Sequence, residues 1–347
     1  MTEQARERGR PLTGPGQRLA DSAFLANVGA PEHSLWRFVV TVMAGSAVFL
    51  IATVVVLAAV VAAFVVWAGW PVPSGMVGLG ALQQRLVALA ASNGRRFGDA
   101  MQILALAIPT NVAPMFAFVG VAMLVHRQPL RRFLTAAPRF RWSVVVIGAV
   151  LSFVLIGPFL IVPALFGPKA PTPPILAVSS NDGLRAVYGL VCVVGFLAAA
   201  LGEETLFRGW LLRETSGVTR NVAVLMVVNG AVFAAAHMQF EPDAFLARWV
   251  MGAGLTYMTL KLGGVELSTG AHLANNLMVV LLQEPLTLKP PPNAGLSPMA
   301  LAPYLGLFIA YVAIAEVTAR WPPLRRWSGA RLAAEPLVQQ GAGPWDS

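Results

Sequence analysis

Two glutamates and an arginine interrupt an apolar stretch of the sequence. Glu203, Glu204 and Arg208 follow the apolar run 189–201, where a helix would otherwise continue through a bilayer. A charged side chain near the membrane centre costs about 2.5–3.5 kcal/mol on insertion scales, so ionisable residues there are candidates for function. Glu204 and Arg208 are four residues apart and can pair on one helical face, whereas Glu203 points about 100° away. We therefore expect Glu204 to be neutralised locally and Glu203 to stay free for chemistry.

Two of the four histidines lie in apolar segments of the same half of the chain. His237 ends the apolar run 222–236, and Phe233 precedes it by one helical turn. His272 and Asn276 are also one turn apart, so both side chains face the same way. If the three helices lie in one bundle, these groups and Glu203 fall at similar depths.

A glutamate and a histidine in a desolvated site can activate a water molecule. A second histidine with an asparagine on the same face supplies hydrogen-bond donors to a developing oxyanion. Glu203 with His237, and His272 with Asn276, would therefore suit hydrolysis of an amide. Glu203, His237 and His272 also match a ligand set of catalytic zinc, although the sequence has no His-Glu-x-x-His motif. A divalent metal such as zinc stays open as a cofactor.

The composition indicates which elements must position these residues. Of the 347 residues, 56% are hydrophobic and 12% are charged, against about 25% charged in soluble proteins. The fold class is therefore all-α, a polytopic membrane protein with lipid as its surroundings. The net charge of +9 comes from arginines spread over the loops, which is typical of topology determinants and not of a nucleic-acid surface. The lone Cys192 excludes an intramolecular disulfide and is expected to be a small buried hydrophobe.

Eight segments are long enough to span a bilayer, which takes roughly 20 residues. The sequence thus predicts a bundle of about eight transmembrane helices, near 37–68, 101–125, 143–166, 185–213, 219–237, 244–262, 265–283 and 299–318. Two further segments, 76–91 and 127–142, have the amphipathic composition of interfacial stretches. The proline-rich stretches 168–174 and 285–298 are expected to be connectors.

The basic residues favour one orientation. With the N-terminus in the cytoplasm and eight alternating spans, 18 of the 25 Lys and Arg residues fall on the cytoplasmic side. We therefore expect both termini in the cytoplasm and, as the location, the cell (plasma) membrane. The polar first 35 residues lack an apolar core of the signal-peptide type, so no cleavable signal peptide is expected.

Three short motifs in chain order resemble those of a known family. They are Glu203-Glu204-x-x-x-Arg208, Phe233-x-x-x-His237 and His272-x-x-x-Asn276. In this order they are similar to the motifs of the CPBP intramembrane proteases, the relatives of the type II CAAX prenyl endopeptidase and of abortive-infection-like proteins. Each motif alone is weak, and the three together over about residues 185–283 are specific.

The resemblance implies an eight-helix membrane endopeptidase with its active site inside the membrane. It implies that Glu203 activates water together with His237, and that His272 and Asn276 steady the oxyanion. Glu204 and Arg208, together with Phe233, would give structural support to the site. The substrate would be a peptide or protein, lipid-anchored in some relatives, met in membrane lipid. Both glutamate-type and metal-dependent mechanisms are argued for this family, and Glu203, His237 and His272 are the candidate ligands if a metal takes part.

The expected organisation has five parts. These are a polar cytoplasmic segment (1–36), N-terminal transmembrane helices with interfacial segments (37–184), the CPBP protease core (185–283), a last transmembrane helix (284–330) and a disordered tail (331–347). Two rival functions stay open. One is a proton-coupled membrane transporter in which Glu203, Glu204 and the histidines relay protons. The other is a catalytically idle, immunity-type membrane scaffold that acts by binding.

Overall fold

The computed structural model describes residues 19–26, 28–159, 162, 172–286 and 301–328. These residues form helices and connecting turns without a β-strand, which confirms the all-α fold class. Most of the expected polar N-terminal segment, most of both proline-rich connectors and the whole 331–347 tail lie outside the described residues. The helices are α3 Ala23–Ala26, α4 Leu35–Ala68, α5 Gly75–Ser92, α6 Phe97–His126, α7 Leu130–Leu134, α8 Trp142–Leu155, α10 Pro174–Ala177, α11 Asp182–Glu204, η1 Thr205–Leu211, α12 Leu212–Val218, α13 Val222–Ala236, α14 Pro242–Leu262, α15 Glu266–Met278, η2 Val279–Gln283, α16 Leu301–Arg320 and α17 Pro322–Ser328.

Four helical segments of the described residues are long and apolar enough to cross a membrane. They are α4, α6, the continuous run from α11 through α12, and α16. Two shorter apolar helices, α8 and α13, accompany them. This composition agrees with a polytopic helical membrane protein, and every one of the eight predicted spans has a helix at its place.

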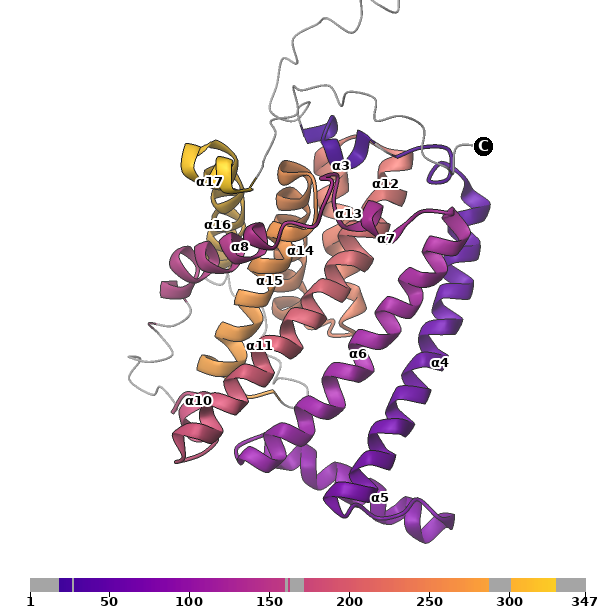
Figure 1. Cartoon of the computed structure of the whole chain (residues 1–347), viewed down its shortest axis with the longest axis vertical. Helices are drawn as coiled ribbons and strands as arrows, with labels where there is room; N and C mark the ends of the chain where they lie inside the picture. Colours follow the sequence, from indigo (N-terminus) through magenta and orange to yellow (C-terminus); the bar gives the residue numbers. More distant parts are fainter. Residues whose placement is uncertain (1–18, 27, 160–161, 163–171, 287–300, 329–347) are drawn as a thin grey trace, which may run out of the picture.

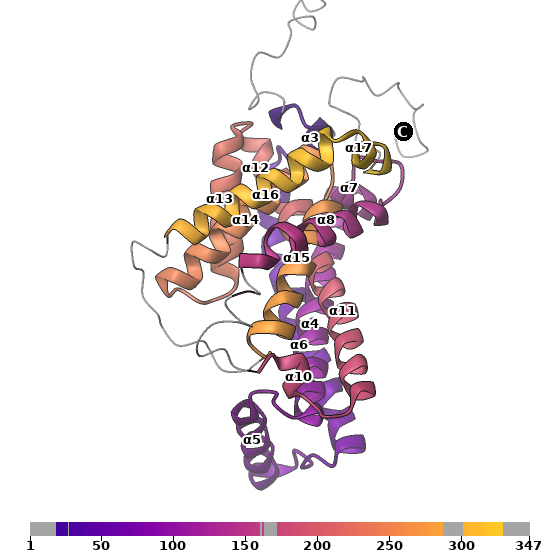
Figure 2. The same ribbon diagram turned by 90° about the vertical axis from the view of Figure 1, so that its left-hand side faces the viewer.

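The helices pack as a chain of neighbours around one interior (Figures 1 and 2). Helix α4 lies along α6, α6 along α11, and α11 along α15. Helix α15 also packs closely on α8, while α14 lies between α13 and α16. Helix α5 sits at the far end of the α4–α6 pair, away from this interior. The three predicted motifs are thereby carried by α11, α13 and α15, which meet in one bundle.

Helix α15 is polar for a membrane helix because protein surrounds it. All but two of its residues are buried against neighbouring helices. Gly270 permits the closest approach, since a Cβ there would lie 1.9 Å from the Val145 carbonyl oxygen of α8. Ser268 and Thr269 bond to the Val265 carbonyl within the helix. A helix with little lipid-facing surface can carry such residues because their hydroxyls are satisfied internally.

Two sequence expectations differ from the structure in detail, those for segments 143–166 and 127–142. The interfacial segment 76–91 is a helix, as predicted, and its place at the membrane surface stays a prediction. The span predicted at 143–166 forms a regular helix only to Leu155, since Pro158 cannot donate the next backbone hydrogen bond and its ring crowds the preceding turn. Segment 127–142 holds only the short α7, whose Phe133 is buried in the main core. Cys192 is fully buried, as expected.

Candidate active site

The first motif lies where an α-helix changes into a wider π-helix. Helix α11 begins at the Asn181 cap, whose side-chain oxygen accepts a hydrogen bond from the Leu184 amide. It ends at Glu204, and the chain continues as the π-helix η1 over Thr205–Leu211. Short π-helical segments are rare and are frequent at functional sites. This change of pitch places the side chains of η1 at angles that an uninterrupted α-helix would not give.

Glu204 and Arg208 form a fully buried ion pair. Arg208 Nη1 donates to Glu204 Oε1 at 2.8 Å, and Arg208 Nη2 donates to the Gly252 carbonyl of α14 at 3.0 Å. The guanidinium also lies 4.4 Å from the centre of the Phe233 ring. The local neutralisation of Glu204 that the sequence indicated is present, and the pair also joins η1 to α13 and α14.

His272 lies between the two glutamates. Its Nδ1 is 2.9 Å from Glu204 Oε1, and its Nε2 is 3.6 Å from Glu203 Oε2. Because Glu204 is the carboxylate partner of Arg208, His272 Nδ1 is the donor in the first contact. Without an added proton, Nε2 then turns a lone pair toward the Glu203 carboxylate. Glu203 and His272 are therefore set to share a proton.

Glu203 is the less restrained of the two glutamates. Its side chain is 15% exposed, against 0% for Glu204. Its Oε2 is buried and accepts no hydrogen bond from the residues that the structure describes. It has no ion-pair partner on its own helix, as the sequence indicated, and His272 on α15 is its nearest basic group. A buried carboxylate oxygen without a donor can accept a proton from a reacting group.

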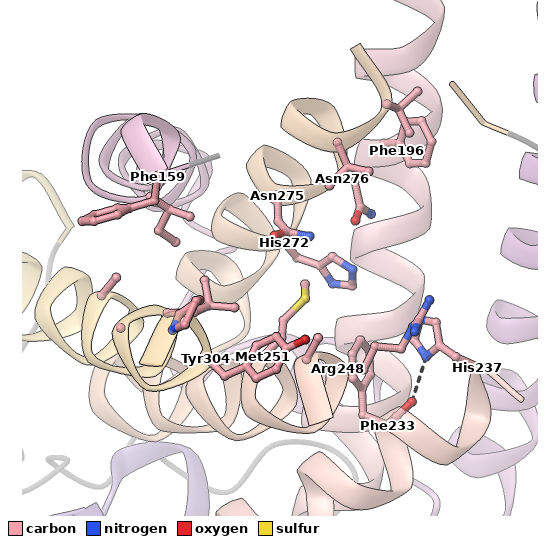
Figure 3. Close-up of a pocket in the computed structure, with 18 of the residues that line it drawn as sticks. Phe159, Phe196, Phe233, His237, Arg248, Met251, His272, Asn275, Asn276 and Tyr304 are labelled. Atoms are coloured by element: carbon pink, nitrogen blue, oxygen red, sulfur yellow. Dashed lines mark hydrogen bonds between the residues drawn. The ribbon is translucent and has the colours of Figure 1, made fainter. Parts of the chain in front are cut away.

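His237 stands at the C-terminal end of α13. Its Nδ1 lies 2.8 Å from the Phe233 carbonyl oxygen, so Nδ1 carries the proton and Nε2 is left as an acceptor (Figure 3). The Phe233 ring packs against both imidazoles, with centroid distances of 4.7 Å to His237 and 5.8 Å to His272. Phe233 thus fixes the two histidines relative to each other. Glu203 acts on His237 electrostatically.

A cavity of about 920 Å³ lies beside these groups. Figure 3 shows His272, Asn275 and Asn276 on α15, with Phe233 and His237 coming from α13. Most of the wall is apolar and aromatic, and its polar side chains are His237, Arg248, His272, Asn275, Asn276 and Tyr304. Three of the predicted catalytic residues line this cavity, namely His237, His272 and Asn276. Glu203 does not line it, but its Oε2 lies 3.6 Å from Nε2 of His272, which does.

Comparison with known proteins identifies this part of the chain. Residues 186–278 match the family model described as type II CAAX prenyl endopeptidase Rce1-like. Residues 186–278 are thus similar to an Rce1-like domain. A curated relative, the Bacillus subtilis (strain 168) protein named "Uncharacterized protein YyaK", is 26% identical over 189 residues, which cover 50% of this chain and 59% of YyaK. No solved structure matches the chain.

The matched domain, residues 186–278, holds the residues of all three motifs, but it does not enclose the cavity alone. Part of the wall comes from Ile156 and Phe159, which follow the α8 region, and from residues 302–310 of α16. Those segments lie outside the matched range. The domain therefore supplies the ionisable groups, and the flanking helices complete the apolar walls.

The described residues do not fit the metal site that the sequence left open. Nowhere in the described ranges do three His, Cys, Asp or Glu side chains come close enough together to hold one metal ion. The chemistry below is accordingly derived from the side chains themselves.

Sequence reasoning missed two features of the site. It did not predict the contact of His272 with Glu204, because contacts between helices are not encoded in the spacing within one helix. It also counted Arg248 only as a loop charge, whereas Arg248 lines the cavity. An arginine within the predicted span 244–262 was the available signal, since charges inside spans mark functional sites.

Proposed function

We propose that the chain is an intramembrane endopeptidase that hydrolyses a peptide bond with a glutamate-activated water. The observation that carries the proposal is the position of His272, held by Glu204 at 2.9 Å and turned toward Glu203 at 3.6 Å beside a largely apolar cavity. The match to Rce1-like proteins supports a CAAX-type protease and a peptide or protein substrate.

In the proposed reaction, Glu203 removes a proton from water as the water oxygen attacks the peptide carbonyl carbon. The new C–O bond places negative charge on the carbonyl oxygen, and that oxyanion is stabilised by the Asn276 amide and by His272 Nε2 when it carries the proton that it shares with Glu203. The C–N bond then breaks, and the proton taken by Glu203 is delivered to the leaving nitrogen. His237 Nε2 assists as the second proton acceptor near the water.

Three residues support this arrangement without reacting. Glu204 fixes the ring of His272 through Nδ1, and Arg208 keeps Glu204 ionised so that it can accept that hydrogen bond. Phe233 separates and orients the two imidazoles. Removal of any of these residues displaces a catalytic group by more than the reaction tolerates.

The proposal also includes where the protein resides in the cell and how it is oriented in the membrane. We place it in the plasma membrane with both termini in the cytoplasm, because most basic residues then lie on the cytoplasmic side. The substrate would reach the cavity from membrane lipid, either as a lipid-anchored peptide or as an apolar segment of a protein.

The test is cleavage by the purified protein in lipid vesicles, supplied with a mixture of apolar peptides and read by mass spectrometry. Wild type is expected to release defined fragments, and Glu203→Ala, His237→Ala and His272→Ala are each expected to release none. The variants must insert and fold as wild type does. Fragments released by folded Glu203→Ala would overturn the proposal.

The same samples separate the two rival functions. A proton-coupled transporter predicts pH changes inside the vesicles upon addition of a solute, without peptide fragments. An idle scaffold predicts neither, and its cellular phenotype would survive Glu203→Gln. Repeating the cleavage assay after exhaustive chelation tests separately whether a divalent metal takes part.

A further inference from the structure

Arginines and tryptophans gather at one end of the bundle. The stretches 127–143 and 320–328 together contain eight arginines and neither aspartate nor glutamate. They comprise α7, the start of α8, the last residue of α16 and the whole of α17. These elements lie in the upper part of both views, whereas α5 lies at the lower end (Figures 1 and 2). We call the two stretches together the basic rim.

Hydrogen bonds join the two stretches of the basic rim. At the start of α8, Arg141 Nη1 donates to the Ser328 carbonyl at 3.4 Å, and Ser143 Oγ donates to the Trp327 carbonyl at 3.3 Å. A helix of seven residues, such as α17, is too short to be stable by itself in water. Its contacts with α8 and α16 therefore hold α17, with its arginines, in a fixed place on the protein.

Most arginines of the basic rim are not neutralised by the protein. Two of the eight form ion pairs, Arg141 with Glu266 and Arg320 with Glu316. The other six are exposed and make no ion pair with the described residues: Arg127, Arg131, Arg132, Arg139, Arg325 and Arg326. Each guanidinium carries five N–H donors and a full positive charge. The rim therefore offers a fixed group of cations to an anionic partner.

Exposed tryptophans indicate where the basic rim lies. The side chains of Trp142, Trp321 and Trp327 are 56%, 54% and 73% exposed. Tryptophan is enriched at membrane–water interfaces, where its apolar ring meets acyl chains and its N–H meets polar groups. The apolar helices α8 and α16 both reach the rim at one end. The arginines beside these tryptophans are therefore expected at the depth of the lipid headgroups.

The partner that fits both features is an anionic phospholipid. A guanidinium binds phosphate oxygens with two parallel hydrogen bonds, and clusters of about four to eight basic residues beside a membrane span are typical of binding to anionic lipids. An acidic segment of a protein would also match the charge. It would not account for the tryptophans, whose rings require an apolar neighbour such as an acyl chain.

We propose that the basic rim is a binding surface for the headgroups of anionic phospholipids, with Arg139, Arg325 and Arg326 as contacts to the phosphate. The proposal is independent of the cleavage reaction, because it concerns the lipid around the protein and not a substrate in the cavity. The two helices that reach the rim also contribute to the cavity wall, α16 through residues 302–310 and the α8 region through Ile156. Lipid bound at the rim thus contacts helices that complete that wall.

The experiment is native mass spectrometry of the purified full-length protein in detergent, titrated with phosphatidylglycerol or with phosphatidylcholine of the same acyl chains. The two lipids differ in the net charge of the headgroup, and the bound molecules counted at each concentration give the affinity for each. Wild type is expected to bind phosphatidylglycerol roughly threefold more tightly or better. Arg325→Gln/Arg326→Gln is expected to lose most of that preference, because two of the proposed phosphate contacts are gone.

Matched variants identify the cause. Arg95→Gln/Arg96→Gln removes a second pair of adjacent, exposed arginines, just before α6 at the end of the bundle where α5 lies, and should keep the full preference. Arg325→Lys/Arg326→Lys keeps the charge and should retain part of the preference. Arg139→Gln should lose part of it. The unfolding temperature of each variant shows that a lost preference does not come from a lost fold.

Four results would overturn the assignment. The first is equal affinity of wild type for the two lipids, and the second is a full preference in Arg325→Gln/Arg326→Gln. The third is an equal loss in both double glutamine variants, because net charge alone would then set the preference. The fourth is tighter binding of a hexaglutamate peptide than of phosphatidylglycerol, since the rim would then favour an acidic protein segment.

Discussion

Two of the buried glutamate–arginine pairs in the bundle differ in how completely their carboxylate oxygens are bonded. Glu266, at the start of α15, receives Arg141 Nε at 2.9 Å on one oxygen and Arg141 Nη2 at 2.8 Å on the other. In the centre, Glu204 receives both Arg208 and His272 on Oε1, while its Oε2 has no hydrogen-bond partner in the described residues.

This difference distinguishes a structural ion pair, at Glu266, which we call the clamp, from the candidate active site at Glu203 and Glu204. The bidentate pair at Glu266 ties α8 to the start of α15 and leaves neither carboxylate oxygen without a hydrogen bond, so it holds the fold. At the centre, Glu203 Oε2 accepts no hydrogen bond from the described residues and lies 3.6 Å from His272, which lines the cavity. Buried polar atoms without partners cost stability, and their retention beside a cavity is what a reactive site requires.

Glu214 shows that bare oxygens alone do not make a site. Both of its carboxylate oxygens lack a hydrogen bond among the described residues, and its nearest basic group is His126 at 3.4 Å. Glu214 lies on α12, and its neighbour His126 does not line the cavity, whereas His272, the neighbour of Glu203, does. A candidate site therefore needs two features together: a carboxylate oxygen without a hydrogen bond and a cavity close by that can hold the substrate.

The largest expected effect is on activity, from Glu203→Gln. An amide cannot accept the proton of water, so cleavage in vesicles should fall by about a hundredfold to ten-thousandfold, the range of general-base catalysis. Stability should change little because Glu203 Oε2 accepts no hydrogen bond. Heating with a maleimide dye that labels the buried Cys192 on unfolding measures this. If cleavage were unchanged, Glu203 would not be the general base, and the centre would differ from the Glu266–Arg141 pair only in structure.

The next largest effect is expected from Arg208→Met, which should lower both the stability of the fold and the rate of cleavage. The change leaves Glu204 as an uncompensated buried charge, and breaking such a pair costs about 3–5 kcal/mol. Cys192 should therefore become labelled at a much lower temperature, and cleavage should be lost along with the position of His272. Arg208→Lys is the matched control, since it keeps the charge and should recover part of the stability.

A smaller effect, confined to stability, is expected from Glu266→Gln. The change weakens the charge-assisted bonds to Arg141, and bonds to charged groups are worth about 1.5–3 kcal/mol each. The labelling temperature of Cys192 should fall, while cleavage per folded molecule stays at the wild-type level. A loss of cleavage in folded protein would show that the clamp also belongs to the site.

The smallest effect is expected from Glu214→Gln. This substitution replaces a buried carboxyl group whose oxygens accept no hydrogen bond from the described residues, so the unfolding temperature should stay the same or rise. Cleavage should be unaffected because Glu214 is outside the cavity. If cleavage instead fell as it does for Glu203→Gln, the cavity would not be what distinguishes the two carboxylates.

The sequence predicted the helices and the local pairs because both depend on neighbouring residues. Runs of apolar residues located a helix at each expected span, and four-residue spacing predicted the Glu204–Arg208 pair. Both follow from the length of a bilayer and the pitch of a helix. Helix lengths and pitch allow α11, α13 and α15 to bring their motifs to similar depths, but only the structure shows that the three helices meet.

Contacts between different helices could not be predicted from the sequence, and the reason is physical. The bond of His272 to Glu204 joins residues 68 positions apart, and that of Arg141 to Glu266 joins residues 125 apart. Helix spacing says nothing about which faces meet, since the crossing geometry depends on small residues such as Gly270. The inward direction of Arg248 is a property of the same kind.

The π-helix η1 has a consequence for how the site could have arisen. A π-helical turn amounts to an α-helix into which one residue has been inserted, and its hydrogen bonds are poorer. Deletion of one residue between Thr205 and Leu211 would let an unbroken α-helix run from Asp182 to Val218, and everything beyond the deletion would rotate by about a quarter turn or more. Arg213, which lies beyond η1, would then turn away from Glu32, so the wider turn keeps the residues that follow it facing their partners on other segments.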